Sequence, residues 1–373
     1  MTTITADVVV IGGGIHGCSS ALQLAKEGLK VVVVERHYPG RHASGVNAGG
    51  VRQLGRDMAE VPLSVASMVM WHDIESLLDD NCGFLQAGQL QVAENEDEFR
   101  LLQLRVAQMQ AAGFDHEVLI GSDHLRELTP AISPHCCGAI LSAKDGHANP
   151  FRTTQAFHRA ARAHGVEFVF GRSVNNIQQR TETWYVSAED YQIQAATLVN
   201  AAGAWGHKIA VQLGEEVSLE PTGLMLMITE RVTPFVKPVV GAVGRTLSFK
   251  QFGNGSVLVG GGLKGKVDIE RFKAYPDLPG LGTNAETATE LFPLMKNVRV
   301  VRSWAGIEGC MLDGIPVIGP SKTHSNAFHL FGFSAHGFQL GPITGTIIRD
   351  LVMGKPSTLP IEPFAVDRFG DGR

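Results

Sequence analysis

The first part of the chain carries the pattern that most restricts its fold. A β-branched apolar run, Val8 to Ile11, leads into Gly12-Gly13-Gly14-Ile15-His16-Gly17, and an Ala/Leu-rich segment then continues to Gly28. A second apolar run, 31–34, ends at Glu35. This order of strand, GxGxxG, helix, strand and acid spans about 30 residues. It is typical of a Rossmann-like unit that binds a dinucleotide.

Each glycine of this fingerprint has its own physical role. Gly12 allows the tight turn after the strand, Gly14 lets the backbone approach a pyrophosphate, and Gly17 lets the helix pack on the sheet. The helix N-terminus then faces the phosphates, and Glu35 accepts hydrogen bonds from ribose hydroxyls. A glycine-rich turn without a ligand is the alternative. It is disfavoured because Glu35 lies at the distance that the fingerprint requires.

The composition excludes several other classes of protein. The chain has 373 residues, of which 44% are hydrophobic and 18% charged, so it can bury a sizeable core and is long enough for two domains. Its net charge of −5 and its lack of basic runs argue against a nucleic-acid partner. Its five cysteines form no CxxC pair and no Cys/His metal spacing, which predicts a reduced protein without a metal site. The sequence has no signal-like start and no apolar run of transmembrane length, which predicts a cytoplasmic protein.

The rest of the chain alternates between helix and strand patterns. The loop 42–52 combines glycines with other small residues, so its backbone can lie close against a large flat ligand. Helices are predicted at 57–82, 95–112, 151–164, 284–292 and 340–353. Strands are predicted at 86–93, 166–170, 173–179, 183–187, 192–200, 298–307, 315–319 and 328–331. The turn-rich segment 217–262 predicts an antiparallel sheet.

Five motifs occur in one order: VVVIGGGIHG, SGVNAGGVR, LVNAAGAW, DGIPVIG and FGFSAHGF. Together they resemble the D-amino-acid oxidase-like family of FAD-dependent oxidoreductases, which includes glycine oxidase, sarcosine oxidase and D-amino-acid dehydrogenase. The pattern is most similar to the β subunits of bacterial hydroxyproline, proline and opine dehydrogenases. The resemblance spans about residues 5–355, and it is specific for the family but not for the substrate.

The resemblance implies a fold of the α/β and α+β classes, with two domains interleaved in the sequence. A Rossmann-like FAD-binding domain would comprise 1–82, 145–215 and 304–373. A substrate-binding domain with an antiparallel or mixed sheet would comprise 83–144 and 216–303. The pattern of residues agrees, because the Rossmann-like segments lie at both ends and the hairpin-rich segment lies between them.

The resemblance also implies which residues contact FAD. Those expected to hold the pyrophosphate and the adenosine are Gly12, Gly14, Ile15, His16, Gly17, Glu35, Arg36, Val174, Ala202, Gly203 and Trp205. Those expected along the ribityl chain and the flavin ring are Ser44, Asn47, Ala48, Gly49, Val51, Gly337, Phe338 and Gln339. The last three lie at the start of the final helix, whose dipole would stabilise negative charge on the reduced ring.

Four residues are implied in the chemistry. Arg52 follows the flavin loop and would bind the substrate carboxylate or stabilise the flavin. Lys250, with Arg245, lies in a segment that faces the substrate in relatives, and solvated strand charges are the alternative. His336 would contact the ring or the substrate amine, through its backbone or its imidazole. Glu308 replaces an arginine of glycine oxidase and D-amino-acid oxidase, and it would meet a cationic part of the substrate or pair with a surface cation.

Three other positions depart from the family pattern. Leu258 replaces the lysine that helps the reduced flavin of single-chain sarcosine oxidases react with oxygen, which favours a dehydrogenase. The spacing of Cys310 to Asp313 does not match that of a covalent-flavin cysteine, so noncovalent FAD is expected. Ala335 replaces a glycine of the family's GFSGHGF, which adds one methyl group.

We therefore expect an FAD-dependent dehydrogenase of a secondary or D-amino acid, such as D-hydroxyproline, proline, sarcosine or an opine. Hydride transfer from Cα–H to flavin N5 would give an imine, and the electrons would pass to a quinone, even one in a membrane, or to α and γ subunits of a hetero-oligomer. The alternative is an oxygen-dependent glycine- or sarcosine-type oxidase that produces hydrogen peroxide. A flavin-carrying subunit without catalysis would share the same cofactor motifs. An NAD-binding reductase is disfavoured because only one nucleotide fingerprint is present and the flavin-loop motifs follow it.

Overall fold

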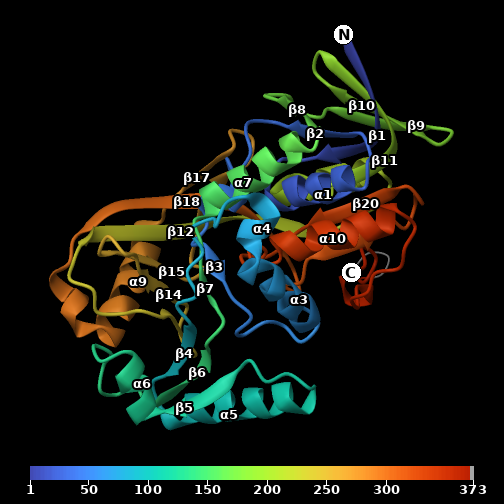
Figure 1. Ribbon diagram of the computed structural model, residues 1–373. Helices are drawn as coiled ribbons and strands as arrows, with labels where there is room; N and C mark the ends of the chain where they lie inside the picture. The colour runs from blue at the N-terminus through green and yellow to red at the C-terminus, as the bar shows by residue number, and fades with distance from the viewer. Residues whose placement is uncertain (370–373) are drawn as a thin grey trace.

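Two large β-sheets with helices packed on them, and one small two-stranded sheet, form the framework of residues 1–369, the part of the chain that the computed structural model describes (Figure 1). The first sheet has eight strands, six of which follow the order β19-β20-β11-β1-β2-β8. Strands β8, β2, β1, β11 and β20 are parallel neighbours, whereas β19 and the β9–β10 hairpin pair antiparallel. The bounds are β1 Thr2–Ile11, β2 Val31–Glu35, β8 Glu167–Phe170, β9 Asn176–Arg180, β10 Thr183–Ala188, β11 Tyr191–Asn200, β19 Val317–Pro320 and β20 Ala327–Phe331.

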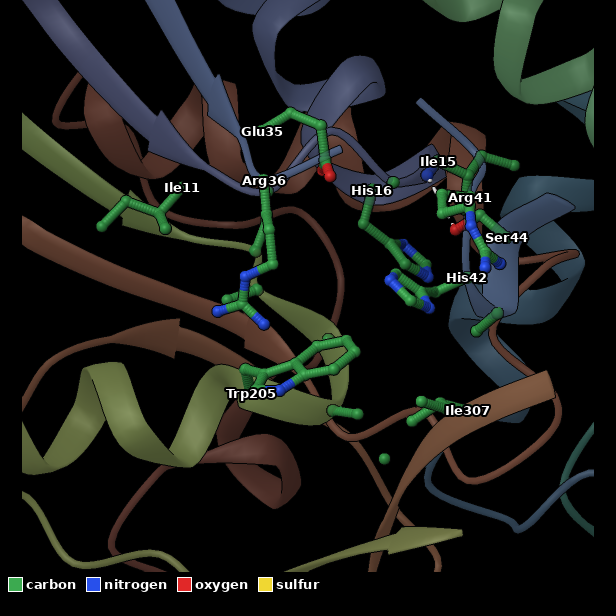
Figure 2. Close-up of a pocket in the computed structure, with 18 of the residues that line it drawn as sticks. Ile11, Ile15, His16, Glu35, Arg36, Arg41, His42, Ser44, Trp205 and Ile307 are labelled. Carbon is green, nitrogen blue, oxygen red and sulfur yellow. Dashed lines mark hydrogen bonds between the residues drawn. The ribbon is translucent and has the colours of Figure 1, made fainter. Parts of the chain in front are cut away.

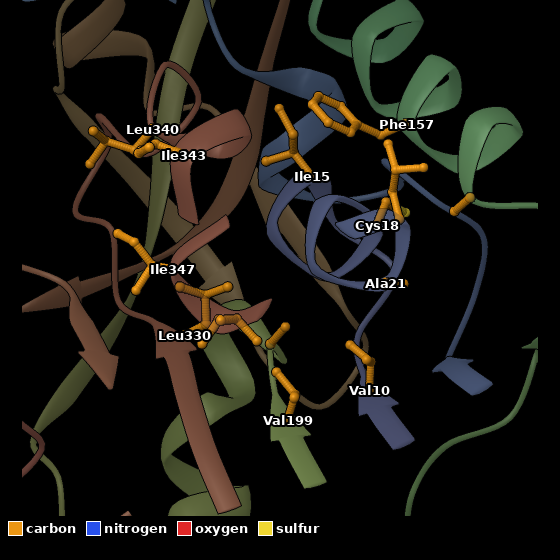
Figure 3. Packing of buried hydrophobic residues seen from close by; sticks show 14 of the residues in the cluster. Val10, Ile15, Cys18, Ala21, Phe157, Val199, Leu330, Leu340, Ile343 and Ile347 are labelled. Atoms are coloured by element: carbon orange, nitrogen blue, oxygen red, sulfur yellow. The ribbon is translucent and has the colours of Figure 1, made fainter. Parts of the chain in front are cut away.

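One face of the first sheet packs against helices α1 (Ile15–Lys26), α7 (Pro150–Ala163) and α10 (Gly341–Val352). Val10 of β1 and Ile15 of α1 belong to this core, which Figure 3 shows between the strands and the helices. Helices α1 and α10 approach closely, because a Cβ at Gly345 would lie 2.3 Å from the Ser19 hydroxyl oxygen. Val9 of β1 belongs to the core on the other face, as the period of two in a strand requires. The helix α1 is thereby fixed at the end of β1, where the fingerprint glycines lie.

The second sheet has ten strands, nine of which follow the order β17-β16-β12-β15-β14-β13-β4-β6-β5, and β18 pairs with β12. The β4–β13 pair is parallel and the others are antiparallel. The bounds are β4 Gln89–Ala93, β5 Val118–Gly121, β6 Gly138–Ser142, β12 Leu219–Arg231, β13 Val239–Ala242, β14 Ser248–Gln251, β15 Ser256–Gly260, β16 Lys264–Asp268, β17 Lys273–Tyr275 and β18 Val300–Met311. The remaining helices are α2 Ala43–Val46, α3 Val61–His72, α4 Ile74–Leu78, α5 Glu96–Ala111, α6 Ser122–Leu128, α8 Gly206–Gln212 and α9 Leu278–Leu291.

The two sheets draw their strands from the segments that the sequence pattern separates. The first sheet uses the N-terminal, middle and C-terminal segments, and the second uses those between. The domain limits remain a prediction, and β18 continues across the limit placed between 303 and 304. The described residues contain no helix long and apolar enough to span a membrane. Among them, no group of His, Cys, Asp and Glu side chains could hold a metal ion.

Two helices differ from their predicted bounds. The segment predicted as one helix at 57–82 forms α3 and α4, which are separated at Asp73, and α4 ends at Asp79 in the left-handed conformation. Helix α9 begins at Leu278, earlier than predicted, because the Asp277 side chain accepts a hydrogen bond from Gly280 N at 3.0 Å.

Candidate active site

A first cavity of about 260 Å³ lies at the carboxyl ends of β1, β2 and β11. This edge of a parallel sheet is where open α/β folds bind their ligands. Most of the residues predicted to contact the cofactor line it: Gly12, Gly14, Ile15, His16, Glu35, Arg36, Ser44, Asn47, Val174, Ala202, Gly203, Trp205, Gly337 and Phe338. The fingerprint and the later motifs therefore converge on one cavity.

The fingerprint glycines bring backbone very close to backbone. Gly12 has φ +109°, and a Cβ there would lie 2.3 Å from the Ala201 carbonyl oxygen. A Cβ at Gly17 would lie 1.9 Å from the Gly12 carbonyl oxygen, so only glycine lets α1 pack this closely on the turn. At the helix N-terminus, Ile15 N donates to Ser44 Oγ at 3.0 Å (Figure 2). Ser44 thus comes from the distant loop to the place where a phosphate would meet the helix.

Glu35 closes the far side of the turn. Its carboxylate accepts hydrogen bonds from Gly13 N at 2.7 Å and from His37 N at 2.8 Å. Burial raises the pKa of Glu35, and these two backbone donors partly oppose that rise. Each oxygen retains a lone pair for a ribose hydroxyl, which suits the role predicted for this acid.

The contacts of Arg36 and Trp205 indicate whether the cavity fits an adenosine-bearing cofactor. The Arg36 guanidinium lies 4.8 Å from the Trp205 ring centroid and 4.4 Å from that of Phe272, and Figure 2 shows it directed toward Trp205. Arg36 Nη1 and Trp205 Nε1 are buried and have no hydrogen-bond partner among the described residues. The same cavity also holds the fingerprint glycines and a helix N-terminus. Together with these two unpaired donors, they fit the pyrophosphate and adenosine of FAD.

The loop 43–51 is held from several sides. Asn47 Nδ2 donates to Ala43 O at 2.8 Å, and Gly49 N donates to Asn47 Oδ1 at 2.7 Å. Trp304 Nε1 donates to Val46 O at 2.9 Å. At its end, β3 (Gly50–Val51) pairs with β7 (Gly146–His147). The loop is therefore a preorganised wall and not a freely moving segment.

A second cavity, of about 330 Å³, lies between this loop and the second sheet. Five residues line both cavities: Ala43, Asn47, Glu308, Ala335 and Phe338. Arg52 and His336, two of the four residues predicted for the chemistry, also line the second cavity, as do Ala48 and Gly49 of the loop. The structure thus brings Arg52, His336 and Glu308 together beside the residues predicted to contact the flavin ring.

Arg52 and His336 belong to a buried polar network that includes Arg56. The Nε and Nη2 atoms of Arg56 donate to Arg52 O at 3.2 Å, and its Nη1 lies 2.9 Å from His336 Nδ1. Glu60 Oε1 lies 3.2 Å from the same imidazole nitrogen. Burial lowers the pKa of His336, the hydrogen bond with Glu60 opposes this fall, and the charge of Arg56 adds to it. The Arg52 guanidinium donates to Leu54 O and faces the second cavity.

Glu308 lies on β18 where the two cavities meet. Burial raises its pKa to about 7, and a backbone hydrogen bond from Ala335 partly opposes the rise. Its carboxyl group therefore exchanges a proton near neutral pH. It forms no ion pair with another described residue, which disfavours the alternative of a rim carboxylate paired with a surface cation.

Three predicted contacts need correction. Lys250 is 1% exposed and lines none of the cavities; it lies behind the loop, where its Nζ donates to Ala48 O. Val51 is fully buried in the core beneath the loop. The Gln339 side chain is also fully buried and bonds Arg56 and Ser64, so a contact of this residue with the flavin through its backbone N–H stays a prediction. Arg245, predicted with Lys250, forms ion pairs with Glu94 and Glu290 and does not line either cavity.

Two residues that sequence reasoning missed line the second cavity. Gln89 on β4 is 8% exposed, and its Oε1 is buried without a partner among the described residues. Gln91 lies two residues further along the same strand and also lines the cavity. The sequence did contain a signal, because two glutamines two apart in a strand share one face. Arg56 carried no comparable signal, since two of its side-chain partners, His336 and Gln339, lie in a loop far along the chain.

Comparison with known proteins agrees with this geometry. The family model described as FAD dependent oxidoreductase (DAO) matches residues 7–351, and the chain belongs to this family. It is therefore an oxidoreductase, and FAD is its cofactor. The fold class predicted from the sequence is confirmed.

Similar proteins cover the whole chain. The hydrogen cyanide synthase subunit HcnC of Pseudomonas aeruginosa is 25% identical, over 98% of this chain and 96% of its own. The sarcosine oxidase subunit beta of Rhizobium meliloti is 26% identical, over 98% of this chain and 89% of its own. The crystal structure of L-proline dehydrogenase from P. horikoshii superposes with a TM-score of 0.91 at 26% identity, covering 99% of this chain and 98% of that one.

Proposed function

We propose that the protein oxidises a secondary or D-amino acid, of the hydroxyproline, proline, sarcosine or opine type, to the corresponding imine. One observation carries the proposal. The second cavity holds a cation, Arg52, and a carboxyl group, Glu308, and it shares a wall with the cofactor cavity. An amino acid needs both charges, one for its carboxylate and one for its amine.

Bound FAD supplies the hydride acceptor for this reaction. Arg52 binds the substrate carboxylate, and its backbone is fixed because Asp145 Oδ2 accepts from Gln53 N at 2.9 Å and from Leu54 N at 3.0 Å. Glu308 faces the amine and, with a pKa of about 7, can accept the ammonium proton that must leave before oxidation. His336 borders the same space and helps to exclude water. Noncovalent binding of FAD is part of the proposal.

Electrons then pass to a partner subunit or a quinone. Two relatives support this part, because HcnC and the sarcosine oxidase protein are both named as subunits of larger enzymes. One observation favours the oxygen-dependent alternative. Lys250 pairs directly with Leu258 across β14 and β15, so a lysine lies one strand away from the position at which single-chain sarcosine oxidases carry theirs.

The test follows the visible absorption of the flavin in the purified protein. N-methyl, cyclic, D- and opine-type amino acids are added without air, and air is then admitted. Bleaching by one of these classes with slow return of colour supports the proposed dehydrogenase. Fast return of the colour, with formation of hydrogen peroxide, supports the oxidase. If no amino acid bleaches the flavin, the proposed substrate class is wrong.

A further inference from the structure

A third cavity, which we call the cationic hollow, borders the loop 43–51 and has a volume of about 790 Å³. Val46, Asn47 and Ala48 line both the hollow and the second cavity, so one layer of chain separates the two. His42 and Ile307 line both the hollow and the first cavity. Arg41 and Asn47 are also shared with the first cavity, so the hollow directly adjoins the cofactor site.

The charge of the hollow is of one sign. Arg41, Arg152, Lys273 and Arg302 line it, and none of its lining residues is Asp or Glu. Arg152 donates to Asp80 at 2.8 Å, whereas the other three form no ion pair with a described residue. The whole chain has a net charge of −5, so this cluster is a local reversal of sign and not the average surface. Such a field attracts anions and raises their rate of encounter.

The cross-strand neighbour of Lys273 does not cancel this charge. Asp268 lies opposite Lys273 in the β16–β17 pair, but its carboxylate accepts from Arg271 N at 3.0 Å and lies 3.8 Å from the Arg271 guanidinium. Lys273 is exposed, and its charge remains available to a ligand.

The walls of the hollow suit a flat ring. Phe252, Tyr275 and Trp304 line it, and the Arg302 guanidinium lies 5.8 Å from the Trp304 ring centroid. His147, on the inner side, is 7% exposed, and its Nε2 is buried without a partner among the described residues. Aromatic faces, unpaired cations and one orphaned ring nitrogen together define a site for an aromatic ligand that carries negative charge.

We propose that the cationic hollow binds an anionic, aromatic electron acceptor that reoxidises the reduced cofactor. The inference rests on the proposed function, and it identifies the electron acceptor of that reaction by its chemical class. A quinoid ring in the hollow takes up two electrons and two protons, one proton coming from the reduced cofactor and one from solvent, so its carbonyl oxygens become hydroxyls. The cations hold the acidic substituent of the acceptor, and the aromatic walls orient its ring beside the loop.

The test begins from protein whose FAD has been photoreduced without air, so no amino acid is required. Stopped-flow mixing then measures reoxidation by 2,6-dichlorophenolindophenol, an aromatic anion, and by ferricenium, a cation. The variant combines Lys273→Glu with Arg302→Glu. The control combines Lys237→Glu with Arg299→Glu, which makes the same change in net charge at exposed positions outside the hollow.

The double variant in the hollow should react with the anionic dye about tenfold more slowly or worse, and the control should not. Ferricenium should react with both at the wild-type rate or faster. Calorimetric titration of the oxidised protein with anthraquinone-2-sulfonate should give weaker binding for the hollow variant only. Equal rates with the dye in variant and control, together with equal binding, would overturn the proposal. Failure of the proposed function is separate, since it appears as a flavin that amino acids do not bleach.

Discussion

Lys250 donates a hydrogen bond from its buried Nζ to the carbonyl oxygen of Ala48, two hundred residues earlier in the chain. The ammonium group lies behind the loop 43–51, and burial lowers its pKa to about 7. Among the described residues, this carbonyl is its one hydrogen-bond partner. The lysine is therefore a support for the cofactor-facing loop and not a group that touches substrate.

We predict that Lys250→Met weakens the binding of FAD by about tenfold, because a hydrogen bond from a charged donor contributes about 1.5–3 kcal/mol. The apoprotein should not lose stability, since the methionine avoids the cost of burying an ammonium group. Fluorescence titration of apoprotein with FAD measures the affinity. Lys264→Met, at an exposed lysine of the same sheet, is the control. An unchanged dissociation constant would contradict the supporting role.

Arg52→Met should raise the amino acid concentration that half-bleaches the flavin by about tenfold to a hundredfold, because the substrate carboxylate loses a charged partner. Anaerobic titration with the best substrate measures this concentration. The exposed Arg299→Met is the control and should match the wild type. If Arg52→Met also matches the wild type, the carboxylate is bound elsewhere.

Gln89→Leu should change kcat/KM for some substrates and not for others. The unpartnered Oε1 of Gln89 can accept a hydrogen bond from a second polar group, such as the hydroxyl of hydroxyproline, that proline lacks. We expect kcat/KM to fall about tenfold for the hydroxylated substrate and little for proline. Gln86→Leu is the control, since that exposed amide bonds Ala143 O outside the cavity. An equal loss of kcat/KM for both substrates would mean that Gln89 shapes the cavity but does not bind the hydroxyl group.

Glu308→Gln should change the pH dependence of stability. Burial raises the pKa of Glu308 from 4.5 to about 7, so between these values the folded protein holds a proton that the unfolded chain has lost. Wild-type stability therefore falls as pH rises through this window. The variant lacks this loss, and at pH 8 it should be more stable on the order of 1 kcal/mol, with no such difference near pH 4. Thermal melts of apoprotein at several pH values test this, with the exposed Glu220→Gln as control.

Ala335→Gly should stabilise the protein. Ala335 has φ +75°, a left-handed conformation that costs a non-glycine residue about 1–2 kcal/mol. The extra entropy of glycine in the unfolded chain offsets part of this gain, so a net increase of about 0.5–1 kcal/mol is expected. Ala107→Gly, at an exposed position inside α5, should instead destabilise by about 1 kcal/mol. A lower melting temperature for Ala335→Gly would show that the methyl group makes a compensating contact.

The sequence predicted the dinucleotide turn well because its requirements are local. Gly17 packs against the backbone of Gly12, and Glu35 accepts from Gly13 N, so these contacts lie within one βαβ unit and spacing alone fixes them. It failed at Lys250, because a side chain's direction depends on what packs behind it. The Lys250 ammonium group is enclosed by a loop far away in the chain. The early start of α9 was missed for a similar reason, since glycines near 280 hid a helix that Asp277 caps.

Asn47 lines all three cavities, and the loop that carries it touches cofactor, proposed substrate and proposed acceptor sites at once. A substitution in this loop cannot change the binding of one ligand without disturbing the binding of the other two. Substrate preference can diverge more freely through β4 and β14, which supply Gln89 and Ser248 to the second cavity alone. Among descendants of such a chain, the loop should therefore stay nearly fixed while the facing strands vary. A change of substrate would then leave the path of the electrons intact.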